Sequence, residues 1–133
     1  MLKTGMRTSP LVVSIPLALV LLGCSSAAPT RPDLVTEPIQ IESVDVLILE
    51  SAPPQVSARV RGVLGDGCAT LHSVGQERSG NTVTVTILRE RPRDAICIQI
   101  AKLYDETIRL EGQFPPGDYV LRVNAFPRAF STS

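Results

Sequence analysis

Apolar and polar side chains alternate in several short runs of this chain, and this pattern constrains its fold more than any other feature. Val83, Val85 and Ile87 alternate with three threonines, and the same period of two recurs over residues 56–61, 96–100 and 119–124. A period of two places one face of a β-strand inward and the other outward. The runs therefore predict half-buried strands.

Turn-forming residues separate these runs, for example Gly65-Asp66-Gly67, Ser79-Gly80-Asn81 and Pro115-Pro116-Gly117. No segment carries an apolar stripe of helical period. Short strands between Gly/Pro turns are typical of an antiparallel sandwich. In the first strand the alternation changes parity around Ser43, where a bulge would let both halves face the core. We expect an all-β domain of about seven strands, at residues 39–49, 56–64, 70–78, 81–90, 95–110 (broken near Lys102), 118–125 and 127–131.

The stretch from Leu110 to Val123 resembles the corner of fibronectin type III and related immunoglobulin-like domains. The resemblance implies that Leu110 ends one strand, that Gly117 belongs to the turn, and that Tyr119 opens the next strand with its hydroxyl bonded back to the turn. The chain departs from that family by having no tryptophan. Its cysteines also lie away from the usual positions between the sheets.

Residues 1–23 have the three parts of a secretory signal peptide. The start carries Lys3 and Arg7 and no acid, the run from Leu11 to Leu22 is apolar, and Gly23 is the small residue at the exit. A membrane-spanning helix needs roughly 18–20 apolar residues, so this run is too short. We expect residues 1–23 to be removed.

The end of this leader, Leu21-Leu22-Gly23-Cys24, resembles the lipobox of bacterial lipoproteins. The resemblance implies cleavage before Cys24 and attachment of diacylglycerol to its sulfur, usually with a further acyl chain such as palmitate on its amine. Several acyl chains together make a lasting membrane anchor. Ser25 after the cysteine favours the outer membrane in a species that has one, with the domain outside the cytoplasm. An ordinary signal peptide cut near Ala27-Ala28 is the alternative.

The chain after the leader divides into a tether and a domain. Residues 24–38 hold the lipidated cysteine and a proline-rich stretch, expected to be disordered up to about Glu37, and residues 39–133 form the sandwich. Removing the leader takes away two basic residues and no acid, which leaves 11 basic and 13 acidic residues and a net charge of −2. A nucleic-acid partner would need a basic excess and is therefore not expected.

The two cysteines that remain when Cys24 is lipidated, Cys68 and Cys97, predict a disulfide in an oxidising compartment. The bridge would staple a sheet end or a loop, and closing about 30 residues would stabilise the fold by roughly 3–4 kcal/mol. A redox or metal role is disfavoured because the two cysteines lie far apart in the sequence and the chain has one histidine.

No catalytic motif occurs in the sequence, and we expect no enzyme, no cofactor and no metal. His72 as a general base is the catalytic alternative. A calcium site would need four aspartates to gather: Asp66, Asp94, Asp105 and Asp118. Turn chemistry already explains Asp66 and Asp118. The charge run over residues 89–94 is interpreted as a solvated loop, with anionic lipid, glycan or a partner as alternatives. The apolar tail from Phe126 to Phe130 predicts the last strand rather than a docking segment.

The sequence therefore favours a lipid-anchored protein of the cell envelope, with a non-enzymatic binding or structural module as its domain. The mature region is similar to small uncharacterised lipoprotein domains of environmental bacteria. Its partner is expected to be an envelope or extracellular protein or polysaccharide. The alternative is an inhibitor of secreted proteases that presents the loops at Gly65-Asp66-Gly67 and Pro115-Pro116-Gly117. A hydrolase using His72 is a third possibility.

Overall fold

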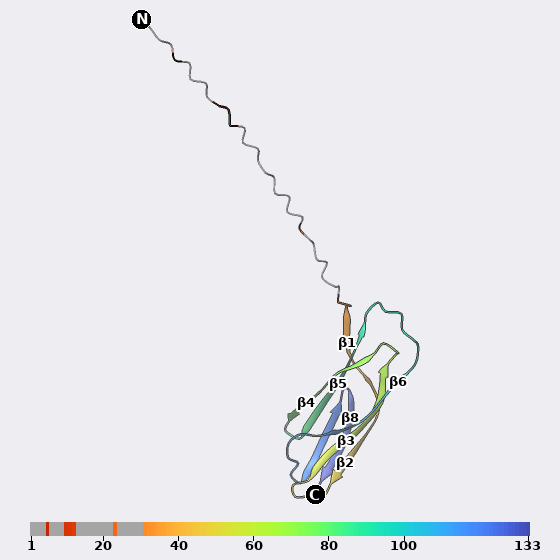
Figure 1. Cartoon of the computed structure of the whole chain (residues 1–133). Helices are drawn as coiled ribbons and strands as arrows, with labels where there is room; N and C mark the ends of the chain where they lie inside the picture. Colours follow the sequence, from red (N-terminus) through yellow and green to blue (C-terminus); the bar gives the residue numbers. More distant parts are fainter. Residues whose placement is uncertain (1–4, 6–9, 13–22, 24–30) are drawn as a thin grey trace. The chain divides into compact units, whose positions relative to one another are not determined.

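The computed structural model describes residues 31–133 and, before them, only positions 5, 10–12 and 23. The predicted lipidation site Cys24 and most of the leader lie outside the described residues. Residues 31–133 form a unit of their own, built of eight strands (Figure 1). Within the described part of the chain, no helix is long and apolar enough to cross a membrane.

The eight strands form two sheets, as expected for a β-sandwich. The larger sheet contains β1 (Leu34–Pro38), β4 (Thr70–Ser79), β5 (Thr82–Pro92), β7 (Gly117–Val123) and β8 (Phe126–Thr132). The smaller sheet contains β2 (Gln40–Leu49), β3 (Gln55–Gly65) and β6 (Lys102–Arg109). The all-β sandwich is therefore confirmed, with one strand more than the seven expected.

The core lies between the sheets and is built from the alternating residues of the central strands. On β5 the valines and isoleucine at 83, 85 and 87 are buried, while the threonines between them are more exposed. The same alternation buries one face of β3 and one face of β7. The fully buried side chains, with less than 2 % of their surface exposed, are Phe114, Ile87, Leu121, Val56, Val60, Val83, Val85 and Val123.

The predicted bulge in the first long strand is confirmed. β2 pairs with β3 in antiparallel register, and this register shifts between Ile41 and Ser43. Val44, just after the shift, is buried in the core, and Ile41 before it is packed against the core. One extra residue thus turns both halves of the strand inward, as the change of parity requires.

One strand pair departs from the antiparallel pattern that we expected. β5 and β7 run parallel, with Thr82 opposite Val120 and Val85 opposite Val123. The other pairings are antiparallel. The parallel pair arises because β6, which lies between β5 and β7 in the sequence, belongs to the opposite sheet. The chain crosses the sandwich twice between β5 and β7, so both strands point the same way.

The expectation of disorder up to Glu37 is wrong for the end of that stretch. Residues 34–38 form β1, which pairs with the far end of β5 from Leu34 opposite Pro92 to Pro38 opposite Leu88. The pairing of β5 with β7 ends at Val85. Beyond this point the backbone groups on that side of β5 are available to a further strand. At the buried Ile39 the chain leaves β1 and enters β2 in the other sheet.

The corner that resembles immunoglobulin-like domains has the geometry that the resemblance implied. The hydroxyl of Tyr119 donates a hydrogen bond to the carbonyl oxygen of Pro115 over 2.6 Å. Leu110 is buried directly after β6, and Gly117 opens β7. The predicted last strand is also present as β8, and its two phenylalanines pack against the core while remaining partly exposed.

Candidate functional site

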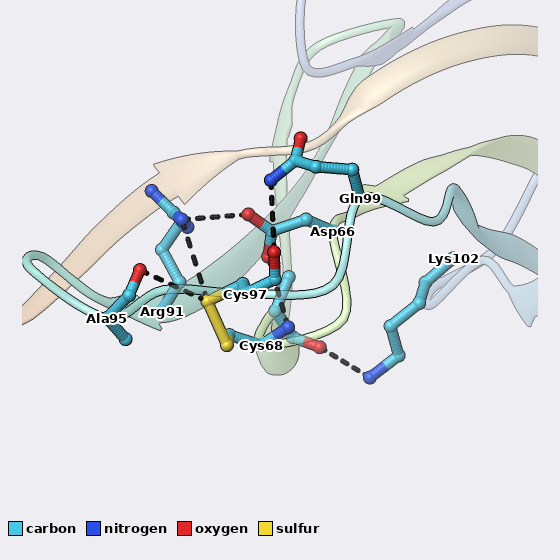
Figure 2. Close-up of a disulfide and its surroundings, with 8 residues drawn as sticks. Asp66, Cys68, Arg91, Ala95, Cys97, Gln99 and Lys102 are labelled. Carbon is cyan, nitrogen blue, oxygen red and sulfur yellow. Dashed lines mark hydrogen bonds and ion pairs between the residues drawn. A yellow bond between two sulfur atoms is a disulfide. The ribbon is translucent and has the colours of Figure 1, made fainter.

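The disulfide lies at one end of the sandwich, where the chain turns out of β3 and where a long loop connects β5 to β6. The structure joins Cys68 of the turn to Cys97 of the loop, and their Cα atoms lie 5.5 Å apart. The pairing is as predicted, and it fastens the loop to the turn rather than one sheet to the other (Figure 2). We call this region, residues 65–69 with residues 93–101 and Asp33, the disulfide end.

Asp66 organises the turn of the disulfide end. Its carboxylate accepts a hydrogen bond from the backbone N–H of Cys68 over 3.1 Å and an ion-paired one from Arg91 over 2.8 Å. The Asp66 and Arg91 side chains expose 19 % and 28 % of their surface. A pair this sheltered holds its geometry better than exposed pairs do. The turn is therefore fixed to β5 by charge as well as to the loop by the disulfide.

The interpretation of the charge run as a solvated loop is wrong for residues 89–92, which belong to β5, whereas Arg93 and Asp94 lie in the exposed loop that follows. Three acids from two segments pair with the arginines of the run: Asp33 and Glu37 at β1, and Asp66 in the turn after β3. Arg89 contacts Glu37 over 2.9 Å, and Arg93 contacts Asp33 over 2.7 Å. Arg89 also donates to the carbonyl oxygen of Leu64 over 3.0 Å. Spaced at a period of two, these arginines clamp β1 and the turn after β3 onto β5.

The loop at residues 93–101 contradicts the prediction of a strand from residue 95. Residues 95–101 form no strand, Ile96 is fully exposed, and Ile98 and Ile100 are 74 % and 54 % exposed. The backbone N–H of Gly67 bonds the carbonyl oxygen of Ile98 over 2.9 Å, and the disulfide holds Cys97. These ties hold the segment over the turn and away from a sheet. We call residues 93–101 the isoleucine loop.

A second feature is an apolar groove where β1 passes into β2. Its volume is about 610 Å³, and Asn124 lies at its wall among side chains from β5 and the β7–β8 turn. Its lining is mostly apolar: Pro38, Ile39, Ile41, Leu88, Ala125, Phe126 and Pro127. Grooves of this size and character accept apolar groups. The groove contains no titratable side chain, which suits binding better than proton transfer.

The predicted metal alternatives find no ligand set in the described residues. Asp66, Cys68 and Cys97 lie within 4.8 Å of one another, but both sulfurs are in the disulfide, whereas a metal needs thiolates. The four aspartates weighed for calcium are spread over the fold. Asp105 pairs with Arg59 on β3 over 2.8 Å, and Asp118 accepts a hydrogen bond from Ser131 on β8.

His72 lies on the exposed strand β4, where its Nδ1 is 3.0 Å from a carboxylate oxygen of Glu90 on β5. No serine is among the hydrogen-bond partners of the His72 ring in the described part of the chain. The arrangement is a cross-strand contact on the sheet surface. The two loops considered for protease inhibition are both tied inward, one through Asp66 and the other through the carbonyl oxygen of Pro115, which accepts bonds from Tyr119 and Thr132.

Asn124 is the residue that the sequence analysis missed. Its backbone has a positive φ of 51° in the turn after β7. Its side chain accepts a hydrogen bond from the N–H of Ile87 over 2.9 Å and donates to the carbonyl oxygens of Ile39 and Ile87 over 2.9 and 3.2 Å. An asparagine directly after an alternating strand is a signal for a left-handed turn residue. Its bridging role needs the three-dimensional structure.

The fold and these contacts define a small β-sandwich domain with one disulfide. The chain belongs to the family of the ORF11 beta-sandwich domain, whose model matches residues 58–132. It is 41 % identical over 86 residues to an uncharacterized 10.2 kDa protein in the HgiCIIM 5′ region of Herpetosiphon aurantiacus, a match that covers 65 % of this chain and 92 % of that relative.

Two further relatives from Herpetosiphon aurantiacus, the uncharacterized 10.2 kDa proteins in the HgiBIM and HgiEIM 5′ regions, are each 39 % identical over 74 residues. Each match covers 56 % of this chain and 90 % of the relative. No solved structure gave a significant match. The residues that the family model matches begin within the sandwich, so the family match concerns the domain.

Proposed function

We propose that this protein is a lipid-anchored component of the bacterial cell envelope, and that its sandwich acts there as a non-enzymatic binding or structural module. The cysteines carry the proposal. Two of the three are joined to each other, and the third is Cys24, at the end of the Leu-Leu-Gly-Cys motif. A disulfide indicates an oxidising compartment. An exported chain with a lipobox-like leader then has one cysteine assigned to the lipid.

The anchor is tested with the full-length chain expressed in a bacterium that is fed an alkyne analogue of palmitate. We expect the label on the wild type and not on Cys24→Ser. A double variant, Cys68→Ser with Cys97→Ser, is the matched control and should keep the label. Mass spectrometry of the N-terminal peptide should find Cys24 with its acyl chains. An unlabelled wild type, or an N-terminus near Ala28, would contradict the proposal and support an ordinary signal peptide.

The position in the envelope is tested by separating the membranes of the same cells. Ser25 favours sorting to the outer membrane in a species with two membranes. Substituting Ser25→Asp should move the protein to the inner-membrane fraction, because aspartate after the lipidated cysteine usually marks retention there. An unchanged distribution would contradict this assignment of the sorting signal without affecting the lipidation result.

The surface of the described domain supports a binding role. The strand β4 lies at a sheet edge with nearly all of its residues exposed, and such edges accept a further strand from a partner. The apolar groove at the β1–β2 crossing offers a separate place for apolar groups. Photo-crosslinkers at Val74 of β4 and at Phe126 of the groove, in the anchored protein, should give reproducible adducts with an envelope protein or polysaccharide.

Two other functions are separated from this one by simple assays. The protease-inhibitor alternative lacks structural support, because both candidate loops bond inward through Asp66 and Pro115. Inhibition of any member of a panel of secreted proteases by the purified protein would revive it. A hydrolase would lose its activity on the change His72→Ala, whereas a binding module would keep its crosslinks.

A further inference from the structure

The isoleucine loop displays apolar side chains that the domain itself does not cover. Ile96, Ile98 and Ile100 are 103 %, 74 % and 54 % exposed, and Leu103 at the start of β6 is 74 % exposed. Single exposed apolar residues are ordinary on protein surfaces, but a contiguous row of them marks an interaction surface. All four side chains come from one stretch of eight residues, and each is more than half exposed.

The backbone of the isoleucine loop is fixed by contacts at several points. Cys97 is bonded to Cys68, and the N–H of Gly67 donates to the carbonyl oxygen of Ile98 over 2.9 Å. At its end, the ammonium of Lys102 donates to the carbonyl oxygen of Ala69 over 2.7 Å (Figure 2). A Cβ on Gly67 would lie 3.1 Å from the oxygen of Ile98, so the approach is close. The isoleucines therefore point outward from a fixed backbone.

The isoleucine loop also lies where the chain enters the domain. The backbone N–H of Arg93 donates to the carbonyl oxygen of Asp33 over 2.8 Å, and its guanidinium contacts the Asp33 carboxylate over 2.7 Å. Figure 1 shows this loop beside the start of β1, with the C-terminus at the other end of the domain. Asp33 follows Cys24 by nine positions, and such a segment spans at most about 32 Å when fully extended.

We propose that the isoleucine loop docks the domain on the lipid surface that holds Cys24, with its isoleucines inserted between the headgroups and the upper acyl chains. This inference rests on the lipidation of Cys24, because a short tether keeps this end of the domain near the bilayer. Arg93 is paired with Asp33, and Asp94 follows directly. The loop thus offers little net charge, and burial of apolar surface rather than attraction to anionic lipid drives the contact.

The chain has no tryptophan, so a single substitution creates a specific fluorescent reporter. The full-length lipoprotein with Ile96→Trp is purified from membranes and reconstituted into vesicles of phosphatidylethanolamine and phosphatidylglycerol that contain a brominated phosphatidylcholine. Bromine on the acyl chains quenches only fluorophores that reach them. We expect the emission of this tryptophan to shift to shorter wavelength and to lose most of its intensity.

The matched control is Leu49→Trp, at the far end of β2, where the leucine is 62 % exposed. Its tryptophan should keep its emission in the same vesicles. Ile100→Trp is a second reporter in the isoleucine loop, so the result does not depend on the folding of one variant. Retained emission of both loop reporters, or equal quenching of Leu49→Trp, would overturn the inference. It would identify the loop as a surface for a protein partner or for none.

The same samples separate this inference from the proposed function. Mass spectrometry of the N-terminal peptide reports whether Cys24 carries lipid in the protein that sediments with the vesicles. A lipidated, sedimenting protein whose loop reporters are not quenched leaves the anchor in place and refutes only the docking of the loop. A protein without lipid on Cys24 refutes the proposed function, and the docking inference falls with it.

Discussion

At the scale of single residues, Asn124 has the most consequential position in the fold. Along β5, residues 82–85 pair with β7, and residues 88–92 pair with β1. The Asn124 side chain fills the interval by bonding both the N–H and the carbonyl oxygen of Ile87. It also bonds the carbonyl oxygen of Ile39, where the chain crosses between the sheets. The carbonyl oxygen of Ile87 also accepts a hydrogen bond from the N–H of Ile39 over 3.1 Å, so the Asn124 amide and the Ile39 backbone together bridge the interval between the two strand pairings.

Replacing Asn124 should destabilise the domain in two separable ways. Asn124→Gly keeps the positive φ but removes the side-chain bonds, which should cost about 1–3 kcal/mol because it leaves sheltered backbone groups unpaired. Asn124→Ala loses the same bonds and also strains the backbone, for about 1 kcal/mol more. Urea unfolding followed by circular dichroism measures both. Wild-type stability of the glycine variant would show that water replaces the amide.

Gly62 allows two strands to approach at the bulge of β2. A Cβ on Gly62 would overlap the backbone carbonyl oxygen of Gln40 on the paired strand. Gly62→Ala should therefore lower the free energy of unfolding by roughly 1–3 kcal/mol, because backbone atoms must move apart.

Gly75 in β4 is the matched control for Gly62, because a Cβ there meets nothing within 4 Å. Gly75→Ala should leave stability unchanged or raise it slightly, since alanine restricts the unfolded chain. Thermal unfolding of the two variants side by side makes the comparison. Equal midpoints would contradict the steric argument for Gly62.

At the scale of elements, period-two alternation located the strands, but it does not say what covers each apolar face. Ile96, Ile98 and Ile100 alternate as regularly as the apolar residues of β5, yet they are exposed. These isoleucines lie in a loop rather than a strand because of the Cys68–Cys97 bond and the contact with Gly67, which join segments distant in the sequence. Local pattern predicted the bulge at Ser43 correctly because a bulge is a property of one strand and its neighbour.

β1 is the opposite case, because a strand forms where the sequence predicted none. Residues 34–38 have little apolar weight and end in a proline, so their composition indicated a spacer. They form a strand because the end of β5 offers an open edge, and Glu37 meets Arg89, some 50 residues away in the sequence. The candidate site was likewise predictable in part. The disulfide and the turn at Asp66 followed from residue types, whereas the arginine clamp depends on tertiary pairing.

Removing the disulfide should destabilise the domain and loosen the isoleucine loop. The bond spans 29 positions, and the double variant Cys68→Ser with Cys97→Ser should lose roughly 3–4 kcal/mol through the greater entropy of its unfolded chain. Limited proteolysis should cut the variant first within residues 93–102. Reductant should lower the stability of the wild type and leave the variant unaffected. Equal stability of the two proteins would show that the clamp of arginines alone holds this end.

At the scale of the whole molecule, the sandwich is asymmetric in how its edges are finished. β1 lies in the larger sheet, and β2, which follows it directly, lies in the smaller sheet. β2 also contacts β8 of the larger sheet. Among the described residues, β4 is an edge strand of the larger sheet and β6 is an edge strand of the smaller sheet. β6 is held to β3 by backbone pairing and by Arg59, which donates two hydrogen bonds to Asp105 over 2.9 and 2.8 Å. This surface pair makes the global stability sensitive to pH.

The hydrogen bonds from the Arg59 guanidinium lower the pKa of Asp105 below its ordinary value, and the same pair raises the pKa of Arg59. Because the folded-state pKa of Asp105 is depressed, the pair stabilises the fold above the ordinary pKa. This contribution is lost as the pH falls through the folded-state value. Asp105→Asn should therefore be less stable than the wild type at neutral pH, and the two should converge in acid.

Glu106, the next residue of β6, makes no ion pair among the described residues, so Glu106→Gln is the control and should follow the wild type at low pH. Both partners of the Arg59–Asp105 pair are about half exposed. High salt should therefore also shrink the difference between Asp105→Asn and the wild type. Urea titrations across a pH series measure it. A difference that persists in acid would mean that Asp105 acts through packing rather than through its charge.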